Sequence, residues 1–519
     1  MWHGSISARM GKTPREARVL QHELLPEPGQ RVLVLARHGN APSRPGENFI
    51  VSELKRTTFE TSRAAEYFTA EGLTKLTEQS VEDFGSVVLK ELGDNALDAA
   101  ETAGVAPELR IKCERLWGIT RVSVLDNGDG IPPKTVESMQ DFSTLTSDKA
   151  HYRTPTRGSQ GNALKTIIGI PRALDIGDEP VVIEGRGTPH TIKPVIDAAG
   201  VPRLPRRVES VEGTLTAGTT VTVPLPTEDV TLDPSYWAKA FALFNPHAFV
   251  NLEQFDRGVE HGERVPETVE SYESTVPESQ SFGKYLPHDW GSPHWYDKGA
   301  LGTLIGAHVA RVLEGHRDMP LGEFIQGFTG LSSPTKAKRV RRLMNGIKHL
   351  SDFGRDDHRL DWFRVGLLLK AMQAECKPPT HKTLGRIGRD HFEARFTQIY
   401  GTLRRFGYRH VESYWPKSRL PYIFEFAVAE TETYNSDALF YGVNHSPTFS
   451  DPLRGAYPTG PKYSGSGTEA FLREGYVHPK WLSSDDPGPR AYTAVALHFI
   501  TPAPMFTGKG KTGLDLGGS

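Results

Sequence analysis

Three side chains that could act on a phosphoanhydride recur at helical spacing in the segment Glu91-Leu-Gly-Asp-Asn95-Ala-Leu-Asp98. Residues three and four positions apart lie on one face of a helix, so Glu91, Asn95 and Asp98 would converge. A carboxylate there could polarise an attacking water, while the carboxamide oxygen of Asn95 could bind Mg²⁺, a hard ion that prefers oxygen ligands. The pairing suits hydrolysis of ATP. An amphipathic helix with a solvated polar face is the alternative for this segment alone.

A second group follows a predicted strand and reads Asp126-Asn-Gly128-Asp-Gly130-Ile131-Pro. An aspartate fixed at a strand end could accept a hydrogen bond from the amino group of adenine, and the glycines would let the backbone pass close to the base. Asn-Gly and Asp-Gly are also strong turn signals, so an ordinary turn is the alternative. The position of this segment downstream of the Glu91–Asn95 helix favours the adenine site.

Glycines before a predicted helix form the third group, and the start of a strand forms the fourth. Free backbone N–H groups at a helix start can hold phosphates, and the helix dipole adds to the attraction. The residues predicted to contact ATP there are Arg157, Gly158, Ser159, Gln160, Gly161, Asn162, Ala163 and Lys165. Thr219, which begins a predicted strand, would lie beside Asp126. Taken singly, these segments are an ordinary glycine turn and an ordinary strand.

Helical and alternating patterns follow one another in blocks along the chain. An apolar stripe predicts the buried face of a helix that begins near Ser80, and its members are Val81, Phe84, Val88, Leu92 and Ala96. Alternation predicts strands at Leu109–Leu116, Ile119–Asp126, Pro180–Glu184, His190–Val195 and Thr219–Pro224. Helices followed by a mostly antiparallel sheet predict an α+β fold.

The second half of the chain mixes loops, helices and strands. Residues 254–281 are polar and acidic, which predicts a loop. Helices are expected within 298–353, at about 360–375 and at about 390–407. Strands are expected at Pro421–Glu430 and Ala491–Ile500.

All four groups, in this order, resemble the GHKL superfamily of Bergerat-fold ATPases, which includes gyrase B, Hsp90, histidine kinases and MutL. The resemblance implies a helix layer on a mixed, mostly antiparallel sheet, with Mg²⁺ and ATP between them under a lid at about 143–161. It implies that Glu91 activates water and that Asn95 binds Mg²⁺. The remaining ATP contacts that it implies outside the lid are Asp98, Asp126, Gly128, Gly130, Ile131 and Thr219.

Beyond these motifs the chain most resembles the B subunits of DNA topoisomerase VI. The similar segments are Asn245-Pro-His-Ala248, Leu286-Pro-His288 with Gly291, Met319–Phe324, Ser333–Val340, Leu420–Ala429 and Phe506–Lys511. The resemblance implies an N-terminal arm (1–52), an ATP-binding domain (53–250), a linker with a helix–two-turn–helix-like helical domain (251–355), and an α/β transducer domain of the ribosomal-protein-S5-like type (356–519).

The resemblance also implies that a lysine near the C-terminus senses the γ-phosphate of ATP. Lys511 is the better candidate and Lys509 the second. Two solvated lysines on a glycine-rich tail are the alternative. The chain departs from this branch at Ala163, where a glycine is common, and at His445, where arginine is usual. Gly93 also interrupts the helix of Glu91, at a cost of about 1 kcal/mol relative to alanine.

The best local candidate for a DNA-binding surface is a run of five basic residues, namely Lys336, Lys338, Arg339, Arg341 and Arg342. On two helical turns they could contact several phosphates, although a solvated basic helix face is the alternative. The resemblance implies an ATP-dependent homodimer that captures double-stranded DNA for a topoisomerase VI A-like cleavage subunit. This chain has no Asp-x-Asp cluster with which to cleave DNA itself. A stand-alone ATP-gated clamp or scaffold, like MutL or MORC proteins, is the alternative function.

Bulk composition sets weaker bounds. A chain of 519 residues suggests about three domains. Its formal charge is −2, from 61 basic and 63 acidic residues, so any DNA-binding surface has to be a local patch. Cys113 and Cys376 are the only cysteines, which argues against a disulfide framework or a structural zinc site. No apolar run has the length of a signal peptide or membrane span, so a cytoplasmic protein without membrane contact is expected.

Overall fold

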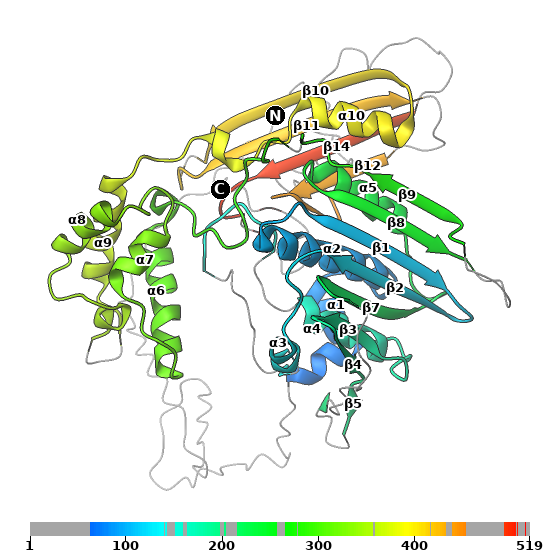
Figure 1. Ribbon diagram of the computed structural model, residues 1–519, viewed down its shortest axis with the longest axis horizontal. Helices are drawn as coiled ribbons and strands as arrows, with labels where there is room; N and C mark the ends of the chain where they lie inside the picture. The colour runs from blue at the N-terminus through cyan, green and yellow to red at the C-terminus, as the bar shows by residue number, and fades with distance from the viewer. Residues whose placement is uncertain are drawn as a thin grey trace, which may run out of the picture. The chain divides into compact units, whose positions relative to one another are not determined.

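The computed structural model describes residues 63–139, 141–142, 151–158, 163–197, 202–203, 215–256, 265–277, 279–355, 359–415, 417–431, 438–452, 492–504, 506 and 514 (Figure 1). All of them belong to one compact unit, Glu60–Ser519. The predicted N-terminal arm at 1–52 lies outside the described residues. Among the helices that the structure describes, none combines the length and apolar character that a membrane span needs.

A seven-stranded sheet forms the first layer, in the order β4-β3-β7-β2-β1-β8-β9. Its strands are β1 (Glu108–Arg115), β2 (Ile119–Asp126), β3 (Val181–Gly185), β4 (Thr188–Ile192), β7 (Thr219–Pro226), β8 (Phe249–Phe255) and β9 (Thr268–Tyr272). Strands β1 and β8 are parallel, and the other neighbours are antiparallel. A short ribbon of β5 (Val195–Ile196) and β6 (Pro202–Arg203) stands apart. The sheet is therefore mixed and mostly antiparallel, as the α+β prediction requires.

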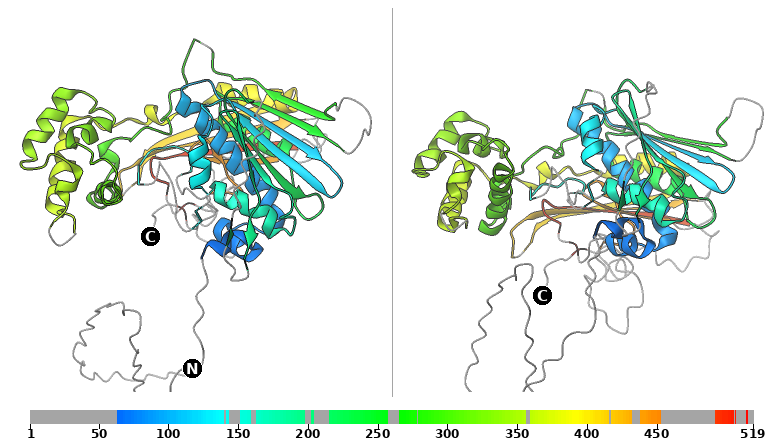
Figure 2. Two further views of the ribbon diagram at one scale, coloured as in Figure 1. Left: turned by 60° about the horizontal axis from the view of Figure 1, so that its bottom comes forward. Right: turned by 90° about the horizontal axis from the view of Figure 1, so that it is seen from below.

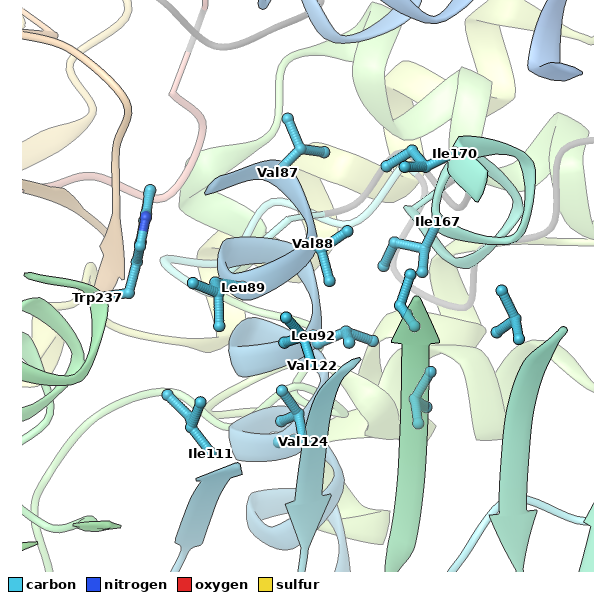
Figure 3. Packing of buried hydrophobic residues seen from close by; sticks show 14 of the residues in the cluster. Val87, Val88, Leu89, Leu92, Ile111, Val122, Val124, Ile167, Ile170 and Trp237 are labelled. Atoms are coloured by element: carbon cyan, nitrogen blue, oxygen red, sulfur yellow. The ribbon is translucent and has the colours of Figure 1, made fainter. Parts of the chain in front are cut away.

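Helices cover one face of this sheet (Figure 2). They are α1 (Ala70–Thr77), α2 (Phe84–Ala103), α4 (Ala163–Ala173) and α5 (Pro234–Phe244), while the short α3 (Pro133–Ser138) follows β2. The predicted stripe of α2 is confirmed, because Phe84, Val88, Leu92 and Ala96 are buried and Val81 packs against the same core. Figure 3 shows Leu92 beside Val122 of β2, and Val88 on the side of Ile167 of α4. Gly104 ends the helix in the left-handed conformation (φ 72°).

Strand β2 shows how the alternating pattern places a polar residue in the interior. Its second, fourth, sixth and eighth residues are buried, and these include Val122, Val124 and Asp126. Successive side chains of a strand point to opposite faces, so the parity that buries the two valines also buries the carboxylate that follows them. The strand thus delivers Asp126 to the face that α2 covers.

A second sheet has the order β10-β11-β14-β12-β13. Its strands are β10 (Leu403–Tyr414), β11 (Pro421–Thr431), β12 (Ala438–Val443), β13 (Ser446–Pro447) and β14 (Tyr492–Ile500). Helix α10 (Arg389–Tyr400) packs on it, and four alanines of β11 and β14 join Phe392 and Phe396 in that core. Helix α5 contributes Phe241 to the first core and Phe244 to the second, so its apolar residues are shared by both sheets.

A helical cluster with its own core follows the first sheet in sequence. It consists of α6 (Lys298–Leu313), α7 (Leu321–Gly327), α8 (Pro334–Leu343) and α9 (Trp362–Glu375). These elements confirm the helices expected within 298–353 and at about 360–375.

Two predictions about the elements were wrong. The helix expected at about 390–407 ends at Tyr400, and Leu403 already belongs to strand β10. Gly401 separates the two, with a backbone (φ 79°, ψ −147°) that disfavours other residues. Residues 254–281 are not all loop, because β9 pairs there with β8.

Candidate functional site

Helix α2 presents Glu91, Asn95 and Asp98 as partly buried side chains. Lys90 and Asp94 lie beside them and are 1 % and 4 % exposed. The Lys90 ammonium lies 2.9 Å from Glu91 Oε1 and 3.0 Å from Asp94 Oδ2. Burial alone would lower the pKa of Lys90, but Asp94 and then Glu91 outweigh it and raise that pKa above its usual value. Lys90 therefore carries its charge inside the protein, shared between two carboxylates.

Asp126 is held at the end of β2 by backbone donors from two elements. Its Oδ1 accepts hydrogen bonds from Gly128 N (2.8 Å) and from Thr219 N at the start of β7 (3.2 Å). Thr219 Oγ1 in turn accepts from Ile131 N at 3.1 Å. The predicted neighbourhood of Asp126, Gly128, Ile131 and Thr219 is therefore present as one hydrogen-bonded cluster.

The glycines around Asp126 are required by backbone packing. A β-carbon on Gly218 (φ 81°) would lie 1.9 Å from the Asp126 carbonyl oxygen, and one on Gly130 (φ 78°) would lie 2.7 Å from the Gly218 carbonyl oxygen. A β-carbon on Gly128 would lie 2.8 Å from the Ala99 carbonyl carbon in α2. The turn therefore rests directly on the helix that carries Asn95, one helical turn before Ala99.

Burial raises the pKa of Asp126 to about 6, even though the Gly128 and Thr219 amides act in the opposite direction. A buried carboxylate that two amides keep in place is a preorganised acceptor. Such a group suits the amino group of a heterocyclic base, because a buried acceptor left without a donor is costly.

The lid sequence is described only in part. Gly158 is exposed, and Ala163 begins α4. Lys165, the third residue of that helix, donates to the carbonyl oxygen of Asp141. Ser159, Gln160, Gly161 and Asn162, which were predicted to contact phosphates, lie outside the described residues, as do residues 143–150.

Arg157 occupies a different environment from the one predicted. Its side chain is fully buried, and its guanidinium lies 3.0 Å from Asp98 Oδ1 and 2.9 Å from Glu101 Oε1. It also donates to Asn245 Oδ1 and to the carbonyl oxygen of His445. These contacts favour a structural role for Arg157, because its donors are directed at the protein interior, and they engage Asp98 as well.

Glu101 is the centre of this buried cluster, and the sequence analysis missed it. Its Oε1 lies 2.7 Å from Lys284 Nζ and 2.8 Å from His247 Nε2, in addition to Arg157. Burial opposes its ionisation, but Arg157 and then Lys284 outweigh that effect and hold the pKa of Glu101 well below its usual range. Burial lowers the pKa of Lys284 to about 8 and that of His247 to about 4. Glu101 lies one turn beyond Asp98, and that spacing on α2 was the signal that could have found it.

The other candidate residues are placed as follows. The DNA-binding candidates lie on α8, where Lys338, Arg341 and Arg342 are exposed. Arg339 forms an ion pair with Glu375 of α9 at 2.7 Å, and Lys336 donates to the Gly330 carbonyl oxygen at 2.7 Å. Lys509 and Lys511 lie outside the described residues.

Comparison with known proteins gives two results. Residues 81–229 match the family described as histidine kinase-, DNA gyrase B-, and HSP90-like ATPase. The chain is also similar to proteins named as the B subunit of type 2 DNA topoisomerase 6. The one from Archaeoglobus fulgidus is 23 % identical over 310 residues, which cover 56 % of this chain and 49 % of that protein. The one from Thermococcus sibiricus is 26 % identical over 353 residues, 60 % of each chain. The chain thus spans half to three fifths of these two relatives.

The matched region contains the Glu91–Asp98 face, the Asp126 turn, α4 and Thr219 within one helix-covered mixed sheet. The sequence match covers the same residues that form the helix-covered sheet and the hydrogen-bonded Asp126 turn. Residues 81–229 are therefore an ATPase domain of the histidine kinase-, DNA gyrase B- and HSP90-like family, in a chain similar to the B subunits of type 2 DNA topoisomerase 6.

Proposed function

We propose that this protein binds and hydrolyses Mg-ATP, and that ATP binding makes it dimerise around double-stranded DNA for a cleaving partner subunit. The observation that carries the proposal is the Asp126 cluster, in which a buried carboxylate is fixed by Gly128 N and Thr219 N directly against α2. Asp126 would accept the adenine amino hydrogen, and Thr219 would keep the turn in place through Ile131.

Glu91 is the residue proposed to take a proton from the attacking water. Its side chain is 22 % exposed, so solvent can reach the carboxylate, and the Lys90 ammonium lies 2.9 Å from its Oε1. Proton removal as the water attacks the γ-phosphorus would leave Glu91 protonated and release ADP and phosphate. Asp98 would act mainly by orienting Arg157.

The residues present fit a magnesium ion that is held jointly with the nucleotide. The described residues contain no group of three or more His, Cys, Asp or Glu side chains that could hold a metal alone. Mg²⁺ commonly takes one or two protein oxygen ligands and completes its shell with phosphates and water. Asn95 would supply the protein oxygen, and the ion would offset phosphate charge.

DNA capture is proposed from the names of the relatives and from the charge of α8. Relatives named as topoisomerase subunits act on DNA by that name. In this chain the exposed Lys338, Arg341 and Arg342 on one short helix would supply phosphate contacts. An A-type subunit would supply cleavage. Mixing this protein and a purified A-type subunit with supercoiled DNA and ATP should give ATP-dependent relaxation of the DNA. If no relaxation occurs, the alternative function, an ATP-gated clamp, is favoured.

The first experiment separates binding from chemistry at Glu91. Glu91→Ala should keep the ATP dissociation constant within a few-fold and lower kcat by about 100-fold or more, the usual effect of removing a general base. Glu71→Ala is the matched control, because Glu71 is an exposed helical glutamate paired with Lys75 in its own helix. Calorimetry would give affinity, and phosphate release would give turnover. Unchanged turnover in Glu91→Ala would contradict the assignment of the base.

A further inference from the structure

The second sheet contacts helix α2, which carries Glu91, through the short hairpin of β12 and β13. Strands β12 and β13 pair as Val443 with Ser446, so Asn444 and His445 form a two-residue turn. Both turn residues have positive φ, 52° and 67°, as the tight hairpin turn of this hand requires. The turn places Ser446 against α2, where its hydroxyl donates to Asp94 Oδ2 at 2.6 Å.

The backbone of this turn is held from three sides. His445 N donates to His498 Nε2 of β14 at 3.1 Å, and the His445 ring contacts the Phe244 carbonyl oxygen at 3.2 Å. The His445 carbonyl oxygen accepts from Asn245 Nδ2 at 3.0 Å and from Arg157. A histidine with positive φ persists only where its surroundings fix it, so Ser446 leaves a rigid support.

Asp94 passes this contact on to Glu91 through Lys90. The oxygen that accepts from Ser446 is also 3.0 Å from Lys90 Nζ, and the same ammonium is 2.9 Å from Glu91 Oε1. Asp94 Oδ1 has no hydrogen-bond partner among the described residues, so Ser446 and Lys90 both act on Oδ2. A buried ammonium cannot exchange its carboxylates for water, so a change at one is felt at the other.

A second side chain from the same segment also meets Lys90. The Lys90 ammonium lies 5.7 Å from the ring centre of Phe449, within the range of a cation–π contact. Phe449 packs edge-on against Trp237 of α5, with ring centres 5.5 Å apart. Residues 446–449 therefore contact Asp94 by a hydroxyl and Lys90 by an aromatic face.

We propose that Ser446, Asp94 and Lys90 form a positioning relay through which the second sheet sets the orientation of Glu91 for water activation. The proposal rests on the proposed ATPase function, and it adds residues that the resemblance did not supply. None of the three touches the reacting atoms, so they are positioning residues. When Ser446 donates to Asp94 Oδ2, the Lys90 ammonium is shared between Asp94 and Glu91 and keeps Glu91 oriented. When the hairpin moves away, Asp94 Oδ2 has only Lys90 as a donor and draws it from Glu91, so the contact that orients Glu91 weakens.

Ser446→Ala in the full chain is the test. We expect kcat for ATP to fall about tenfold, while the dissociation constant of a non-hydrolysable ATP analogue stays within about twofold, because the adenine and phosphate contacts are untouched. Ser446→Thr keeps the hydroxyl and should restore at least half of the parent kcat. Phe449→Leu should lower kcat in the same direction through its separate contact with Lys90.

Ser235→Ala is the matched control, since it removes another serine–carboxylate hydrogen bond, to Glu270 of β9, which is not part of the relay. It should leave kcat unchanged. If Ser446→Ala keeps the parent kcat, or if Ser446→Thr is as slow as Ser446→Ala, the relay is wrong. Glu91→Gln measured in parallel distinguishes the two levels of inference. If the parent protein shows no ATP hydrolysis, the proposed function itself fails. If Glu91→Gln hydrolyses ATP like the parent, Glu91 is not the base and the relay fails with that assignment; if Glu91→Gln is inactive while Ser446→Ala is normal, only the relay fails.

Discussion

The buried carboxylate of Asp126 should make both the stability of the fold and the affinity for nucleotide depend on pH. Asp126 has a pKa of about 6 because burial disfavours its ionised form. Since that pKa lies above the value of an unfolded aspartate, the ionised group costs stability. Its favourable contribution is full below the unfolded pKa and is lost as the pH rises through about 6. In the proposed adenine site the ionised carboxylate of Asp126 is the acceptor, so nucleotide binding is expected to have the opposite dependence.

We therefore predict that affinity for adenosine, which has no titrating phosphate, falls about tenfold from pH 7 to pH 5, the change expected when one proton binds with a pKa near 6. Titration by NMR at several pH values would measure it. Asp126→Asn should abolish ATP binding in calorimetry at neutral pH. A pH-independent adenosine affinity, or normal ATP affinity in Asp126→Asn, would remove Asp126 from the adenine site.

Helix α2 shows why a residue that weakens an isolated helix can be necessary in a packed one. A β-carbon on Gly93 would lie 2.3 Å from the Phe241 ring of α5. The glycine gives up about 1 kcal/mol of helix propensity and allows the two helices to approach. The propensity penalty that the sequence predicts at this position therefore has a packing reason that only the second helix reveals.

Gly93→Ala should destabilise the fold by about 1–3 kcal/mol, because overpacking outweighs the gain in propensity. Urea unfolding would measure it, and Phe241→Leu added to Gly93→Ala should recover part of the loss. Gly306→Ala in α6 is the control, since its β-carbon would meet Leu360 at an ordinary 3.5 Å and should stabilise slightly. Equal effects at both glycines would show that packing against Phe241 is unimportant.

Helix α8 is the element at which DNA binding can be tested. Replacing Lys338, Arg341 and Arg342 together by alanine should weaken duplex binding and lower the slope of log affinity against log salt by up to about 3, one contact per cation. Fluorescence anisotropy at several salt concentrations would measure it. Arg339→Ala should have a smaller effect, because Glu375 already neutralises that guanidinium. If the slope of log affinity against log salt is unchanged in the triple variant, DNA does not bind at α8.

The elements were predictable where the pattern is local. Strands β1 and β2 and the buried stripe of α2 follow from alternation and from helical spacing, and both are confirmed. The predicted helix overran into β10 because sequence patterns place the ends of elements poorly, and only pairing with β11 fixes where the strand begins. The residues around Asp126 were predictable because the sequence motif that contains them resembles that of the GHKL superfamily. The Arg157 network was not, because its partners are distant along the chain: Asp98 is 59 positions away and His445 is 288 positions away.

At the scale of the whole molecule, the proposed switch lysine links the C-terminal region to the γ-phosphate. Lys511 lies outside the described residues, so its role stays a prediction. Lys511→Ala should lower ATP turnover about tenfold or more, as expected when a cation that stabilises developing charge is lost. ADP affinity should be nearly unchanged, and ATP-dependent dimerisation in sedimentation should disappear. Lys509→Ala is the control and should be mild. A Lys511→Ala protein that dimerises and turns over like the parent would exclude this switch.

The buried guanidinium of Arg157 also affects how the protein melts. It joins Asp98 and Glu101 of the first layer to the His445 carbonyl of the second sheet, and α5 lends its apolar sides to both cores. Separating the layers would strand Glu101 and its cations in a low-dielectric interior, or flood that interior with water, and either costs several kcal/mol. Partial opening between the first layer and the second sheet is therefore unfavourable. The two sheets should unfold on heating in one cooperative transition, measured by calorimetry.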